Sequence, residues 1–201
     1  MPVRVIVFDF DGTLVDSRAL KRTAYDHVFW DQPRCLDALP AIIAALRHNS
    51  RYEIISAAVD LIPSLTPSAR ASERERRTHA YSAWVEEAIV SRAASSPAGP
   101  LLPVWRARAA LYVCSLTPVE PLRRILERLR WLDYFDGVEG YPLDKAEMLR
   151  RAVARHGVRA EDTLMVGDED GDESAARDAG TRFFRVREIS DLARLDESLT
   201  P

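Results

Sequence analysis

Residues 3–13 read VRVIVFDFDGT and combine an apolar, β-branched run with a polar turn that carries two aspartates. A short, nearly continuous apolar run of this kind predicts a strand buried within a parallel sheet. Alternate residues of a strand point to the same side, so Asp9 and Asp11 can face one site where the strand ends. In open α/β sheets, ligands bind beyond the carboxyl ends of the strands, which makes this turn a candidate site.

Further strands alternate with helical patterns along the rest of the chain. The strands are predicted at Ala110–Cys114, Thr163–Val166 and Arg182–Val186, and the helices at Val119–Leu132, Lys145–His156 and Glu173–Ala179. Strands that alternate with helices favour a doubly wound, mostly parallel α/β sheet with a Rossmann-like core.

The stretch 17–98 differs because it has helical periodicity and no convincing strand. Tyr81, Trp84, Val85, Ala88 and Ile89 repeat at the three- and four-residue spacing of one helix face. We therefore predict a helical cap domain at 17–98, inserted into an α/β core made of 1–16 and 99–201. Within the cap, the charged run Arg74–Arg77 is interpreted as a solvated helix face.

Composition bounds the class of protein. The 201 residues are 47% hydrophobic and 29% charged, with a net charge of −3, as in a soluble globular chain. A mildly acidic chain is a poor candidate for binding nucleic acid, and no apolar run has the length of a membrane helix or a signal segment. Two cysteines far apart do not suggest a disulfide framework, so we expect a cytoplasmic protein.

A second acidic cluster follows the strand predicted at Thr163–Val166. Residues 167–173 read GDEDGDE, and Asp168 and Asp172 would join Asp9 and Asp11 at the same edge of the sheet. Crowded carboxylates either acquire raised pKa values or bind a cation, and hard carboxylate oxygens around an open position suit Mg²⁺.

Two single residues complete the candidate site. Ser115 ends the strand at Ala110–Cys114, and Thr117-Pro118-Val119-Glu120 predicts a helix start just after it, with Thr117 as the N-cap. A helix N-terminus beside a hydroxyl group suits a phosphate.

Lys145 is one of two lysines in a chain whose other 26 basic residues are arginines. Asp144 is predicted as an N-cap and Glu147 as its capping-box partner, which places the Lys145 cation at the unfavourable end of a helix. A compact ammonium group that contacts both carboxylates and a phosphate would explain this position.

Taken in order, these elements resemble the haloacid dehalogenase-like hydrolases, in the branch of phosphatases and phosphomutases with a helical cap. The resemblance rests on DFDGTLVDS at 9–17, on Ser115 and Lys145, and on Gly167-Asp168-x-x-x-Asp172 followed by Ala175-Ala176 and Ala179-Gly180. It implies that Asp9 is the nucleophile that forms an aspartyl-phosphate and that Asp11 is the general acid and base. Ser115 and Lys145 would hold the phosphoryl oxygens, and Gly12 would allow the close approach of the phosphate.

The resemblance also implies a Mg²⁺ site. Its ligands would be Asp9, the backbone carbonyl of Asp11, and Asp168, with Asp172 as a further acidic member that acts through water or by orienting Lys145. The implied substrate is a small phosphorylated metabolite. Many relatives carry Asn after the serine, whereas this chain has Leu116, so the class of substrate stays open.

The protonatable Asp11 favours phosphate-ester hydrolysis, because the dehalogenase branch of the family lacks this aspartate. Two alternatives remain. One is a phosphomutase that uses the same aspartyl-phosphate chemistry, and the other is a non-catalytic binding or regulatory module on a phosphatase fold.

Overall fold

The apolar run near the N-terminus forms the central strand of a parallel sheet in the computed structural model, which describes residues 2–46 and 50–199. The strands lie in the order β3-β2-β1-β4-β5, and every neighbouring pair is parallel. Their bounds are β1 Val5–Phe8, β2 Ala110–Pro118, β3 Gly137–Tyr141, β4 Thr163–Gly167 and β5 Arg182–Arg185. The predicted doubly wound α/β class is confirmed.

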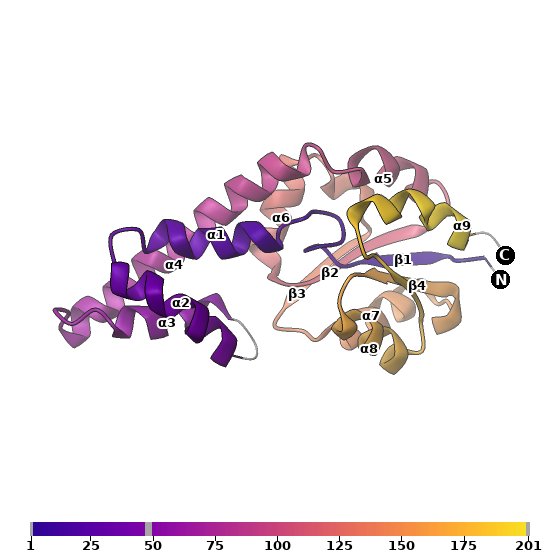
Figure 1. The fold of residues 1–201 in the computed structure, drawn as a ribbon. Helices are drawn as coiled ribbons and strands as arrows, with labels where there is room; N and C mark the ends of the chain where they lie inside the picture. Colours follow the sequence, from indigo (N-terminus) through magenta and orange to yellow (C-terminus); the bar gives the residue numbers. More distant parts are fainter. Residues whose placement is uncertain (1, 47–49, 200–201) are drawn as a thin grey trace. The chain divides into compact units, whose positions relative to one another are not determined.

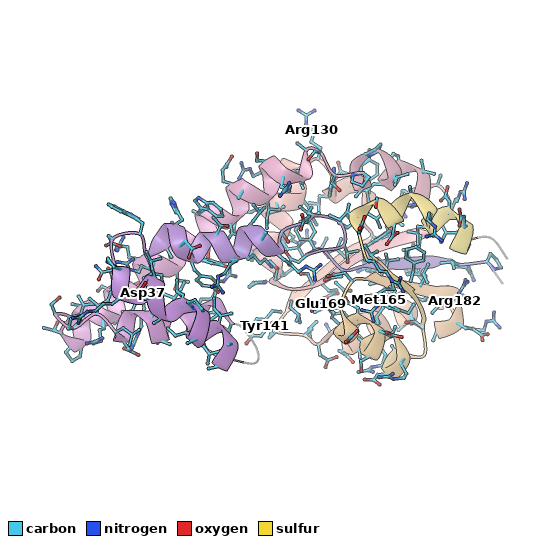
Figure 2. All side chains as sticks on the ribbon, in the orientation of Figure 1. Asp37, Arg130, Tyr141, Met165, Glu169 and Arg182 are labelled. Atoms are coloured by element: carbon cyan, nitrogen blue, oxygen red, sulfur yellow. The ribbon has the colours of Figure 1, made fainter. Side chains whose placement is uncertain are left out.

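Helices cover both faces of this sheet, with α7 and α8 on one face and α5 and α9 on the other (Figure 1). The α-helices of this part are α5 Ala98–Arg106, α6 Val119–Arg128, α7 Lys145–His156, α8 Asp170–Ala179 and α9 Leu195–Leu199. Short 3-10 helices occupy η1 Leu132–Tyr134, η2 Ala160–Asp162 and η3 Ile189–Arg194.

The sheet is buried as the sequence predicts. Val5 and Val7 pack with Met148 and Leu149 of α7 in one apolar cluster, and the Phe8 ring packs in a tilted arrangement against Trp105 of α5, with ring centroids 5.0 Å apart. Residues from Val5 to Phe8 are fully buried, so β1 is packed on both faces. This packing fixes the direction and position of the turn that follows β1.

One strand was not predicted from the sequence. The edge strand β3, Gly137–Tyr141, reads GVEGY and contains two glycines and one charged residue. It pairs with β2 alone in the strand order, so it needs less apolar character than a central strand. Its hydrophobic signal is therefore too weak to separate it from a loop.

The remaining helices are α1 Arg18–Val28, α2 Pro33–Ala45, α3 Arg51–Asp60 and α4 Pro67–Ala93.

The chain divides into two compact units, Met1–Arg18 with Ile89–Pro201, and Ala19–Ala88. These bounds differ from those proposed from the sequence, 17–98 for the insertion, because the division falls inside the continuous helix α4. No sequence breaker marks that point. The predicted breaker cluster, residues 95–100, lies only partly between the helices, because α4 ends at Ala93 and α5 already begins at Ala98. None of the helices within the described ranges is long and apolar enough to cross a membrane.

Within the helical unit, Arg77 of α4 is buried rather than solvated, and the interpretation of Arg74–Arg77 as an exposed face is wrong at this residue. Its side chain is 1% exposed and forms a two-pronged ion pair with Asp31 at 2.9 and 3.0 Å. It also donates to the Val28 carbonyl and to Glu73, and its guanidinium lies 4.6 Å from the centroid of the Phe29 ring. Arg77 thus ties α4 to the end of α1 and the loop beyond it.

Replacing this arginine tests how much the helical unit depends on it. We expect Arg77→Met to lower the free energy of unfolding by about 2–3 kcal/mol, because a buried charge pair loses one partner while both carboxylates keep some access to water. The matched control is Arg76→Met, whose side chain is 60% exposed. Urea denaturation followed by circular dichroism measures both, and equal losses for the two variants would contradict the assignment.

Candidate active site

The carboxyl ends of β1, β2 and β4 meet at one edge of the sheet. Phe8, the last residue of β1, lies opposite Val113 of β2 and Val166 of β4. The polar residues that follow these positions are therefore brought together from three separate segments of the chain: Asp9 and Asp11, Ser115, and Asp168. Helices α7 and α8 add Lys145 and Asp172 from one face.

Lys145 joins two of the carboxylates. Its Nζ lies 2.8 Å from Asp9 Oδ1 and 2.5 Å from Asp172 Oδ1, and its side chain is only 10% exposed. Asp144 caps α7 by accepting from the Glu147 backbone N–H at 2.8 Å, which confirms the predicted helix start. The lysine at this unfavourable end of the helix is thus balanced by two buried carboxylates.

Asp172 also belongs to the start of α8. Its Oδ2 accepts from the Glu169 backbone N–H at 3.0 Å, so one carboxylate both caps the helix and holds Lys145. A Cβ on Gly167 would lie 2.5 Å from the Asp172 side chain. The glycine at the end of β4 is needed because any side chain there would displace this carboxylate.

Asp168 is held by residues of the segment that follows β1. Its Oδ1 accepts from the Thr13 hydroxyl at 3.0 Å, and Arg18 Nη1 lies 3.0 Å from its Oδ2. Gly12 has a φ of +85°, and a Cβ there would lie 2.5 Å from Asp168 Oδ2. Gly12 therefore serves both the left-handed turn and the close approach of this carboxylate.

The burial of these charges affects their protonation. Burial raises the pKa of Asp9 to about 8, an effect that Lys145 opposes and that the charges of Asp172 and Asp11 reinforce. Burial alone would lower the pKa of Lys145, but the ion pairs with Asp9 and Asp172 together outweigh it and raise that pKa. Lys145 is therefore held as a cation, while the carboxylate of Asp9 needs further positive charge to be stable.

The site has the donors that a hard divalent cation requires. Asp9, Asp168 and Asp172 each offer a carboxylate oxygen, and these oxygens lie within 4.8 Å of one another. Asp168 Oδ2 is buried and has no hydrogen-bond partner within residues 2–46 and 50–199, although Arg18 is at ion-pair distance. Clustered carboxylate oxygens with one unsatisfied buried atom fit a magnesium-type ion.

Asp11 is surrounded by hydroxyl groups instead. Its Oδ2 accepts from Thr117 Oγ1 at 2.9 Å and from Ser115 Oγ at 3.4 Å, and Ser17 donates to its Oδ1. Its carboxyl group is not among the clustered oxygens found in the described part of the chain. Asp11 is thus oriented by neutral donors, as suits a group that exchanges a proton.

The helix start predicted with Thr117 as N-cap and Pro118 as the first helical residue is one residue too early. Strand β2 continues to Pro118, helix α6 begins at Val119, and no side-chain cap bond forms at Pro118. The Thr117 hydroxyl donates to the Asp11 carboxylate, a charged acceptor that makes a strong hydrogen bond. Ser17 and Thr117 are site residues that the sequence reading missed, and only their closeness to the two motifs could have indicated them.

The three predicted phosphate-binding residues have different surroundings. Lys145 is at the carboxylate cluster, and Ser115 is 1% exposed, with its Oγ also accepting from the Thr117 backbone N–H at 3.0 Å. The backbone N–H of Gly12 donates to the Val15 carbonyl at 2.7 Å, so this amide already has an acceptor within the turn.

A hollow of about 480 Å³ opens beside Lys145, between the starts of α7 and α8. Leu116, which is 61% exposed, is part of its lining together with Arg150 and Ser174. Leu116 therefore places an exposed apolar side chain at the edge of this hollow.

Comparison with known proteins adds two sequence findings. Residues 3–180 match the model of a protein family described as haloacid dehalogenase-like hydrolase. The chain is also 27% identical over 198 residues to a phosphoglycolate phosphatase of Vibrio cholerae serotype O1, a match that covers 90% of this chain and 83% of that protein. The family match includes every candidate site residue.

Two solved structures share the fold. A putative β-phosphoglucomutase from Thermotoga maritima superposes with a TM-score of 0.76 at 16% identity, covering 98% of this chain and all of that one. A 2-haloacid dehalogenase from Pseudomonas syringae superposes with a TM-score of 0.66 at 16% identity, with 98% and 100% coverage. At these identities the likeness shows the fold alone, so the chemistry has to be argued from the site.

Proposed function

The chain belongs to the haloacid dehalogenase-like hydrolases, and we propose that it is a Mg²⁺-dependent phosphatase that acts on a small phosphorylated metabolite through an aspartyl-phosphate. The observation that carries this proposal is the placing of Asp9 against Lys145, with Asp168 and Asp172 beside it. A carboxylate fixed between a cation and further carboxylates suits attack on phosphorus once the negative charge is balanced.

In the proposed reaction, a carboxylate oxygen of Asp9 forms a bond to phosphorus while the bond from phosphorus to the leaving oxygen breaks. Asp11 donates a proton to that oxygen and thereby becomes a carboxylate. It then takes a proton from the water that attacks the aspartyl-phosphate, and inorganic phosphate leaves as Asp9 is restored. The hydroxyl groups of Ser115, Ser17 and Thr117 orient Asp11 for both transfers.

Lys145 and Ser115 would contact the phosphoryl oxygens. The Lys145 ammonium already lies 2.8 Å from Asp9 Oδ1, so a phosphoryl group at Asp9 would be within its reach. Fixed positive charge of this kind stabilises the charge that develops during transfer. The Lys145 side chain is only 10% exposed, so little water screens its charge and the electrostatic stabilisation is stronger.

Asp9, Asp168 and Asp172 are the side chains that would hold Mg²⁺, together with the backbone carbonyl of Asp11. When bound, the ion would balance the repulsion between anionic Asp9 and an anionic phosphate. The buried Asp168 Oδ2, which has no hydrogen-bond donor in the described part of the chain, supports this assignment.

The presence of Asp11 separates this proposal from dehalogenation on the same fold. An alkyl halide releases halide, which needs no proton, whereas an alkoxide leaving from phosphate does. The relative from Vibrio cholerae bears the name of a phosphatase of a small phosphorylated acid. Phosphorylated hydroxy acids are therefore the first substrates to test, followed by sugar phosphates and nucleotides.

A phosphate-release screen with Mg²⁺ tests the proposal. We expect steady release from at least one small phosphate ester and from simple aryl phosphates. A phosphomutase would release phosphate from aryl esters only feebly and would interconvert sugar phosphates instead. No turnover of any ester by the folded protein would contradict the proposal.

Removal of the divalent ion gives a separate prediction. We expect EDTA to reduce phosphate release to background, because a phosphate dianion would then meet three clustered carboxylates that Lys145 neutralises only in part. Mg²⁺ added in excess of the chelator should restore the rate, and a thermal melt in EDTA establishes that the protein is still folded. Full activity in the chelator would contradict the role of the metal.

A further inference from the structure

Arg18 reaches the candidate metal site from the start of α1. Its Nη1 lies 3.0 Å from Asp168 Oδ2, and the arginine side chain is 57% exposed while that of Asp168 is 2% exposed. The two charged groups therefore differ in exposure to solvent: a buried, fixed carboxylate is paired with a long side chain that extends largely into solvent. Such a pair can open at low cost, because the guanidinium can be hydrated and the aspartate cannot move.

The two oxygens of Asp168 differ in the same way. Oδ1 accepts from the Thr13 hydroxyl at 3.0 Å, whereas Oδ2 has no donor with hydrogen-bond geometry among the residues that the structure describes. Arg18 thus balances the charge of Oδ2 without satisfying its lone pairs. Oδ2 is thus the oxygen that still has lone pairs available, and it is also the oxygen that Arg18 contacts. A metal ion and Arg18 would therefore use the same atom.

We propose that Arg18 is a tethered cation that competes with a divalent metal ion for Asp168 and leaves that carboxylate when the ion binds. The inference rests on the proposed function, because it places the ion at Asp9, Asp168 and Asp172. Two cations on one carboxylate oxygen repel each other, so binding of the ion and the Arg18 pair exclude one another.

Charge balance in the cluster agrees with this exchange. Lys145 neutralises one of the three clustered carboxylates, and a divalent ion would neutralise the other two without help from Arg18. Before the ion binds, Arg18 is the cation that limits the repulsion at Asp168. The pair therefore stabilises the metal-free protein, and the apparent affinity for the metal falls in proportion to the fraction of molecules in which the pair is open.

The test measures binding of Mn²⁺, used as the probe ion, by the loss of the free-ion electron paramagnetic resonance signal. We expect Arg18→Gln to lower the Kd for Mn²⁺ by about two- to sixfold, the range set by partly exposed ion pairs. The matched control is Arg22→Gln, which removes the same charge one helical turn further along α1 and should leave the Kd unchanged. Added NaCl should narrow the difference between wild type and Arg18→Gln, because salt screens an exposed ion pair.

An unchanged or weaker affinity in Arg18→Gln, or equal tightening in both variants, would overturn the inference. The proposed site is checked on its own by Asp168→Asn, which should weaken Mn²⁺ binding severely. If wild type binds Mn²⁺ but Asp168→Asn binds it equally well, the ion lies elsewhere and the proposed metal site fails. If that site holds and Arg18→Gln has no effect, only the inference about Arg18 fails.

Discussion

Asp9→Asn should abolish phosphate release, with a loss in kcat of at least about a thousandfold. The amide has the shape of the carboxylate but cannot attack phosphorus, and Asp172 remains to pair with Lys145. Burial raises the pKa of Asp9, so the charged form is costly in the folded protein and its replacement should leave the thermal midpoint unchanged or higher. Phosphate release and a thermal melt measure the two effects.

The matched control for this variant is Asp133→Asn. Asp133 is exposed in η1, which precedes the amino end of β3 and so lies at the opposite edge of the sheet from the site. Its variant should retain the wild-type rate. Retention of more than a few per cent of activity in Asp9→Asn would contradict its role as nucleophile.

Lys145→Met should lower the rate by at least about a hundredfold, because a fixed charge next to the reacting phosphoryl group is lost. It should also lower the free energy of unfolding by about 3 kcal/mol, since Asp9 and Asp172 are left as buried carboxylates without their shared cation. Mg²⁺ should recover part of this stability, because the ion would bind the same carboxylates. Phosphate release and urea denaturation with and without Mg²⁺ measure these effects.

Lys21→Met provides the matched control, as the same change at the chain's other lysine. Lys21 belongs to α1 in the helical unit, and its backbone carbonyl accepts from the Tyr81 hydroxyl, a bond that the substitution keeps. Near-normal activity in Lys145→Met, or equal losses in the two variants, would show that the ammonium of Lys145 is not part of the site.

The parts of the fold that could be predicted are those whose sequence signal is local. The buried strands β1 and β4 are apolar runs, and α7 begins at the predicted Asp144 cap. Strand β3 lacked such a signal because it is an edge strand with two glycines. The buried Arg77 could not be anticipated because its partner Asp31 is 46 positions away and a charged run is usually solvated.

In the candidate site, too, residues with a local sequence signal could be predicted, whereas contacts between distant residues could not. Asp9, Lys145 and Asp168 stand at strand or helix ends that the sequence marks, and their convergence follows from parallel strands. The contacts of Thr117 and Arg18 depend on loop geometry and on side chains that reach across 106 and 150 positions, respectively. For Thr117, the local pattern indicated only a helix cap, and it could not reveal that the hydroxyl also donates to a carboxylate far away in the sequence.

The most direct test of the central claim is to trap phosphate on Asp9. An aryl phosphate has a leaving group that needs no protonation, so Asp11→Asn should still transfer its phosphoryl group to Asp9 but should hydrolyse the product slowly. Acid quench during turnover with Mg²⁺, followed by mass spectrometry of the peptides, should then find phosphate on Asp9. Release of the aryl alcohol with phosphate on another residue, or on none, would contradict the proposed mechanism.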